Sequence, residues 1–211
     1  MVKLRVVFVS AISATAFWVA LPCLASGQNV PSDSIVWFHP NQEVRVRDLP
    51  YLTAPSTDSS AVLATALETI LHDKAVCCGK DSALEDVALS DPASLKDLSI
   101  GLQGRHFLNS GQAITFHAEY IPPGSIDPGI IIGALLEQHA PLIEWKDHYY
   151  VVYGAIFNET LYYSGRRQYV ILKFLLLDPR FSDQRRESVF SRETDNWGKV
   201  QGVLTMSMVR Q

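Results

Sequence analysis

The first two dozen residues constrain this chain most, because they set the compartment in which the rest must fold. Two positive charges within the first five residues precede an apolar stretch over residues 6–24, and small residues follow at 25–27. This three-part layout is typical of a secretory signal peptide. Cleavage after Ala25 or after Gly27 fits the preference for small residues at the cut. We therefore expect a signal peptide over residues 1–27 and an exported protein, either periplasmic or extracellular.

Two alternatives concern the same segment. The apolar stretch approaches the length of about 20 residues that spans a bilayer, so the segment would act as an uncleaved anchor if it were retained. Cys23 would be the acceptor of a lipoprotein signal, but Pro22 directly before it fits that processing poorly. Pro22 and the small residues behind it favour cleavage, which leaves no stable membrane span in the mature protein.

The composition bounds the function classes. Removal of the signal leaves about 185 of the 211 residues, enough for one domain with its own core. Hydrophobic residues make up 47% and charged residues 19%, which is ordinary globular composition. The net charge of −4 argues against nucleic acid as a partner, because phosphate contacts need a clustered excess of Lys and Arg. No motif indicates a cofactor.

The mature chain divides into an N-terminal arm, residues 28–57, and one domain, residues 58–211. The arm is rich in Pro, Ser, Asn and Asp and has one strand-like patch at 35–38, so it resembles a surface segment. In the domain, helices are expected early and strands late, which is the order of an α+β domain. The expected helices cover 61–71, 81–89, a run from 95 and 129–138; the expected strands cover 113–120, 141–145, 148–155, 169–177 and 200–209.

The cysteines raise the question of chemistry. Without Cys23, the mature chain keeps only the adjacent pair Cys77 and Cys78. Neighbouring cysteines cannot join distant parts of a fold, so the chain has no disulfide framework; the pair could be reduced, bonded to each other or structural. Cys78 precedes Gly79 at the expected start of a helix, where amide groups and the helix dipole favour a thiolate.

A base and an orienting acid for such a thiolate also occur at the ends of elements. His148 begins a strand after the turn Lys146-Asp147, and Asp178 ends the long apolar strand before Pro179. A thiol nucleophile needs a base to accept its proton, and an imidazole needs an acceptor to fix its tautomer. Each residue also has a simpler interpretation on its own. Cys78 could be a small buried side chain, His148 a residue of a turn, and Asp178 part of an Asp-Pro signal that ends a strand.

With these motifs in this order, residues 60–180 resemble the papain-like cysteine peptidases of the bacteriocin-processing type. Three segments carry the resemblance: Cys78-Gly79-Lys80-Asp81-Ser82-Ala83-Leu84; Ala140-Pro141-Leu142-Ile143 followed by His148-Tyr149-Tyr150-Val151-Val152-Tyr153-Gly154; and Leu177-Asp178-Pro179. The resemblance implies a papain-like α+β fold with N-terminal helices packed on a C-terminal antiparallel sheet. It also implies a hydrolase that cleaves peptides or amides through a thioester, with Cys78 as nucleophile, His148 as general base and then acid, and Asp178 as orienting group.

The sequence departs from the family pattern at the oxyanion position. The family has Gln six residues before the nucleophile, and this chain has His72 there. A protonated His72 could donate the same hydrogen bond, or it could be a solvated helix residue. Trp145 and Tyr149 could line a substrate cleft or could simply pack on the sheet. His106 and His117 with the cysteine pair match no common zinc spacing, so no metal is expected.

A second register leaves the function open. The helix over 61–71 is the best amphipathic segment of the chain, and its start could be the family's nucleophile position. Ser59 or Ser60 would then stand where the thiol is needed. In that register the protein is a catalytically inactive domain that binds a peptide or protein partner. The sequence therefore favours an exported cysteine peptidase, with the inactive binding domain as the alternative.

Overall fold

The computed structural model describes residues 31–50, 52–73, 94–107, 113–181, 185–189 and 199–210. Of this described part, 48% is strand and 23% is helix, and the sheet is antiparallel. The expected papain-like arrangement of N-terminal helices packed on a C-terminal sheet is therefore wrong. The fold is dominated by its sheet, and one strand of that sheet precedes the first helix. Residues 32–211 form one compact unit.

Most of the helices and strands predicted from periodicity are confirmed, because their patterns are local. The helix predicted over 81–89 and the pair Cys77-Cys78 lie outside the described residues. The described elements are, in chain order, β1 (Ile35–Arg45), α1 (Ser59–Asp73), α3 (Leu95–Leu102), β2 (Gly104–Phe107), β3 (Ala113–Ile121), α4 (Pro128–Leu136), β4 (Leu142–Trp145), β5 (His148–Tyr162), β6 (Arg167–Leu177), β7 (Arg185–Val189) and β8 (Val200–Arg210).

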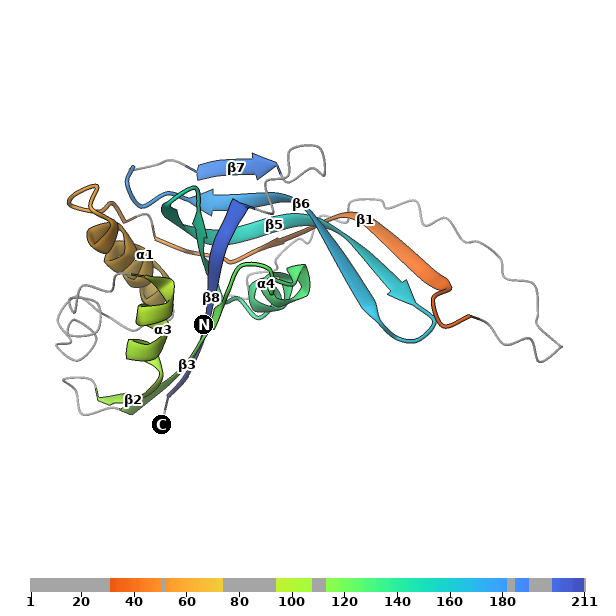
Figure 1. Ribbon diagram of the computed structural model, residues 1–211, viewed down its shortest axis with the longest axis horizontal. Coiled ribbons are helices and arrows are strands. Elements are labelled where there is room, and N and C mark those ends of the chain that lie inside the picture. The colour runs from red at the N-terminus through yellow and green to blue at the C-terminus, as the bar shows by residue number, and fades with distance from the viewer. Residues whose placement is uncertain are drawn as a thin grey trace, which may run out of the picture. The chain divides into compact units, whose positions relative to one another are not determined.

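The strands are ordered β2-β3-β8-β4-β5-β6-β7, and β1 pairs with β5 beside this path (Figure 1). The last strand of the chain thus lies between β3 and β4, which precede it by many residues. Strand β5 has two successive neighbours on one edge. Its first residues pair with β4, from His148 opposite Trp145 onward, and its later residues pair with β1, from Gly154 opposite Arg45 onward.

Strand β1 makes the predicted arm an integral part of the sheet. Where it meets β5, a Cβ atom on Gly154 would lie 2.7 Å from the carbonyl oxygen of Val44, so only glycine allows this close approach. The side chain of Gln138, just after α4, also binds this strand. Its amide accepts a hydrogen bond from the Arg47 N–H at 3.2 Å and donates one to the Arg45 carbonyl at 3.2 Å.

Helices cover both faces of the sheet: α1 and α3 lie on one face, and α4 covers part of the other (Figure 1). Helix α1 packs on β5, and its apolar residues recur at the spacing that predicted the helix. Each of its Val, Leu and Ile side chains contributes about 1.5–3 kcal/mol when it is fully buried. No helix in the described part of the chain is long and apolar enough to cross a membrane. The buried apolar residues of α1 are Val62, Leu63, Ala66, Leu67, Ile70 and Leu71.

Candidate functional site

Two regions of the sheet carry polar side chains that could form a site, and the first includes the predicted His148. Its ring is exposed at the start of β5, after a two-residue turn in which Lys146 and Asp147 have φ angles of 53° and 60°. Such a turn joins antiparallel strands tightly. Of the other predicted residues, Cys78 lies outside the described residues, and His72 lies in the last turn of α1.

Asp178 follows the last residue of β6, and its side chain is fully buried. Arg180 folds back onto it through a bidentate contact, with distances of 2.8 Å from Nε to Oδ1 and 2.6 Å from Nη2 to Oδ2. The Arg180 backbone N–H also donates to Oδ1 at 3.1 Å, and Nη2 reaches the Tyr150 hydroxyl at 3.3 Å. The hydrogen bond to Asp178 is the largest cause that raises the pKa of Arg180. The carboxylate thus has a strong structural partner of its own.

The register brings His148 and Asp178 to the same end of the paired strands β5 and β6. Val151 pairs with Leu177, so β5 begins where β6 ends. Side chains alternate between faces along a strand, and His148 therefore shares the face of Tyr150, which Arg180 contacts. Helix α1 covers the opposite face, because Val151 and Leu177 line a small cavity with Thr69 of that helix. Alternation therefore separates His148 from the helix that begins at Ser59 and Ser60.

The two aromatic residues predicted for a cleft have different surroundings. Tyr149 is buried on the face that α1 covers. Burial raises the pKa of its phenol, and the neighbouring Glu144 raises it further, with smaller contributions from Asp97 and Tyr120. Trp145 is half-buried: its ring lies 5.9 Å from that of Tyr150, and the Lys146 ammonium lies 4.4 Å from the ring centroid. Tyr149 is thus in the core, and Trp145 lies at the end of β4, beside the turn to β5.

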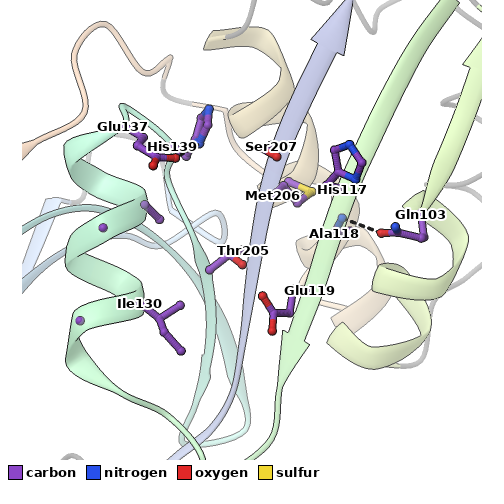
Figure 2. Close-up of a pocket in the computed structure, with 13 residues that line it drawn as sticks. Gln103, His117, Ala118, Glu119, Ile130, Glu137, His139, Thr205, Met206 and Ser207 are labelled. Carbon is purple, nitrogen blue, oxygen red and sulfur yellow. Dashed lines mark hydrogen bonds and ion pairs between the residues drawn. The ribbon is translucent and has the colours of Figure 1, made fainter.

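The second region is a groove between α4 and the strand pair β3–β8 (Figure 2). Its volume is about 470 Å³, which lies within the range of about 300–1,000 Å³ that is common for ligand sites. Helix α4 leaves the outer part of this sheet face uncovered, and the groove lies along that boundary. It is lined by Gln103, His117, Ala118, Glu119, Gly129, Ile130, Gly133, Ala134, Glu137, His139, Thr205, Met206 and Ser207.

The strand wall of the groove follows from the register of β3 and β8. His117 is opposite Ser207 and Glu119 is opposite Thr205, so their side chains share one face. Figure 2 shows Thr205 and Glu119 directed toward the helix. The amide of Gln103 closes the neighbouring edge, because its Oε1 accepts a hydrogen bond from the Ala118 N–H at 2.8 Å. The wall thus offers a carboxylate, an imidazole and two hydroxyls.

The helix wall is built from small residues. Asp127 caps α4 by accepting a hydrogen bond from the Gly129 N–H at 2.7 Å, and Pro128 occupies the first turn, as helix starts favour. A Cβ atom on Gly133 would meet no atom within 4 Å. Since Gly133 also lines the groove, the missing side chain is part of the open volume. Glu137 caps the carboxyl end of the helix.

Sequence reasoning missed this groove. The sequence singles out His117 only as a possible zinc ligand, and no motif in it points to Glu119, Glu137 or Thr205. The alternation of polar and apolar residues over 117–120 was a signal for a strand with one open face. Nothing local indicated that β8 would supply the rest of the wall. Among the described residues, no group of three His, Cys, Asp or Glu side chains is placed to hold a metal ion.

No protein-family model matches the chain, and no curated protein matches its sequence at a significant level.

Proposed function

We propose that this chain is an exported binding protein that holds an extended segment of a partner polypeptide in the groove beside α4. The groove itself is the observation that carries the proposal. It is open to solvent, it combines apolar surface from Ile130 with the polar strand wall, and it has the volume of a ligand site. These properties suit side-chain recognition of a polypeptide.

Gly133 provides a direct test. A side chain there would start in the open space of the groove, because a Cβ atom at Gly133 would meet no atom within 4 Å and Gly133 lines the groove. Leucine and alanine both favour a helix over glycine by about 0.5–1 kcal/mol. Gly133→Leu should therefore fill the groove in a protein at least as stable as the wild type, and Gly133→Ala is the matched control that leaves the groove open.

The assay is selection of random displayed peptides on the protein purified after export, followed by affinity measurement for the selected sequences. We expect enriched peptides to bind the wild type and Gly133→Ala equally and Gly133→Leu at least about tenfold more weakly, a loss of about 1.4 kcal/mol. Failure to enrich any peptide, or equal binding to Gly133→Leu, would contradict the proposal.

A second candidate is the thiol hydrolase, in which Cys78, His148 and Asp178 form the triad and His72 supplies the oxyanion contact. The position of His148 and Asp178 at the same end of the paired strands β5 and β6 favours it. Labelling with a thiol-reactive probe across pH tests it, comparing the wild type with Cys78→Ala and His148→Ala. Loss of Cys78 labelling near neutral pH in His148→Ala would support the thiolate–imidazole pair; unchanged labelling would exclude it.

A further inference from the structure

Apart from His117 and His139, the ionisable residues that line the groove are acidic. Glu119 lies on the strand wall and Glu137 lies at the end of α4, and no Lys or Arg is among the lining residues. Within the described part of the chain, no cationic side chain forms an ion pair with the Glu119 carboxylate; the salt bridges lie elsewhere. A concave surface with this charge distribution attracts positively charged groups.

The position of Glu137 is unfavourable for the helix on its own. The carboxyl end of a helix carries partial negative charge, so basic residues stabilise it and acidic residues do not. Helix α4 has no basic residue in its last turn, and its carboxyl cap is Glu137. The nearest positive candidate is His139, whose Nδ1 is 3.6 Å from the carboxylate. This contact is longer than a normal hydrogen bond. A cation supplied by a ligand would therefore offset the negative charge at the carboxyl end of α4.

The surface between the two carboxylates suits the stem of a basic side chain. Figure 2 shows Ile130 directed into the groove between α4 and β8, and Thr205 opposite it. Lys and Arg side chains lie with their methylene groups along such apolar surface and keep the charged end near polar groups. Glu119 and Glu137 occupy separate positions in the groove (Figure 2), so each can receive a different basic residue.

We infer that the groove recognises a polypeptide segment that carries at least two basic residues, one directed to Glu119 and one to the Glu137 end of α4. The inference rests on the proposed function and specifies the partner's chemistry. Ile130 contacts the stems, and the hydroxyl of Thr205, opposite Glu119, adds a polar contact beside that carboxylate.

The experiment uses three fluorescently labelled short peptides of equal length in which two positions are both Lys, both Gln or both Glu. Their affinities for the exported protein are measured by fluorescence anisotropy at low and at high salt. The Lys peptide should bind at least tenfold more tightly than the Gln peptide, and the Glu peptide most weakly. High salt should reduce the advantage of the Lys peptide, because exposed charges are screened.

Three variants locate the effect. Glu119→Gln and Glu137→Gln should each weaken binding of the Lys peptide about three- to fivefold, the size expected for exposed ion pairs, and should leave the Gln peptide unaffected. Glu68→Gln is the matched control, since Glu68 is exposed on α1 at the other face of the sheet. Glu137→Gln should also raise the melting temperature, because it removes a negative charge from a helix carboxyl end.

The outcomes separate the two proposals. If the Lys and Gln peptides bind equally and Gly133→Leu still blocks both, the preference for basic residues is refuted and the binding function stands. If none of the three peptides binds, the basic-segment inference fails, and the peptide selection decides the binding function on its own. If Glu119→Gln and Glu137→Gln weaken the Lys peptide no more than Glu68→Gln does, the groove is not the recognition site for the basic residues.

Discussion

Replacing Asp178 with asparagine removes one charge from an ion pair that is almost out of contact with water. The Asp178 side chain is 0% exposed and that of Arg180 is 13% exposed. Asparagine keeps the size of the side chain and can still accept the backbone hydrogen bond from Arg180. The bidentate contact between carboxylate and guanidinium is lost, and a nearly buried positive charge remains.

The expected loss of stability follows from the number and kind of contacts. Two side-chain hydrogen bonds between opposite charges disappear, at 2.6 and 2.8 Å. Removal of one partner of a buried ion pair costs about 3–5 kcal/mol. Some relief comes from the Tyr150 hydroxyl, which still contacts the guanidinium at 3.3 Å. We therefore expect Asp178→Asn to lower the free energy of unfolding by about 3 kcal/mol.

Urea unfolding followed by tryptophan fluorescence measures this free energy. The variant Arg180→Met removes the guanidinium but keeps much of its length, and the double variant removes both charges. The double variant should lose at least about 1.5 kcal/mol less than the sum of the single losses, because contacting residues are coupled. Additive losses, or a loss below about 1 kcal/mol in Asp178→Asn, would refute the structural role of this pair.

A second cycle combines Asp178→Asn with His148→Ala. If Asp178 acts chiefly on Arg180, the two losses should add within about 0.5 kcal/mol. A larger coupling would instead favour Asp178 as the orienting group of the predicted triad.

Three further predictions concern the frame around the sites. Gly154→Ala should destabilise the protein by about 1–3 kcal/mol in thermal unfolding, because its Cβ would lie 2.7 Å from the Val44 oxygen; a neutral result would mean that β1 and β5 do not approach so closely. Burial and then Asp147 raise the pKa of Glu144, so the folded state holds this proton more tightly than the unfolded state and stability falls as pH rises through that range. Glu144→Gln should thus raise the free energy of unfolding at pH 7, by less than about 1 kcal/mol for a partly exposed group, and with it the melting temperature, but should raise neither at pH 3; an equal gain at both pH values would contradict this prediction. Ser94 caps α3 by accepting the Asp97 N–H at 3.1 Å, so Ser94→Ala should cost about 1 kcal/mol in urea unfolding, and an unchanged midpoint would show that the cap is dispensable.

The sequence predicted what is encoded locally. Helix α1 and strand β6 have apolar patterns that are complete within each segment, and the structure confirms both. Strand β1 could not be recognised over its full length, because most of its residues are exposed and it lacks clear alternation. The position of β8 between β3 and β4 depends on pairing between distant segments, which no local pattern encodes.

The candidate sites show the same limit. Asp178 was expected at the end of a strand, and it is there, but sequence reasoning did not anticipate that Arg180 would fold back onto it. The only sequence signal for this contact was Arg180 itself, a basic residue two positions after Asp178. The groove draws on α4, β3 and β8, so its Glu119 and Thr205 become neighbours only once the sheet has formed.

The pairing of β1 with β5 has a consequence for the order of events during synthesis. Phe38 pairs with Thr160, so the strand made first waits for a partner that follows about 120 residues later, or about 6–24 seconds at common translation rates. During that interval the apolar side chains at 35, 36 and 38 have no strand beside them. Pro40 and the irregular register near it make this strand a poor template for other chains. Among the described strands, β1 thus waits longest for its first partner, and a nascent chain that stops before β5 keeps that edge unpaired.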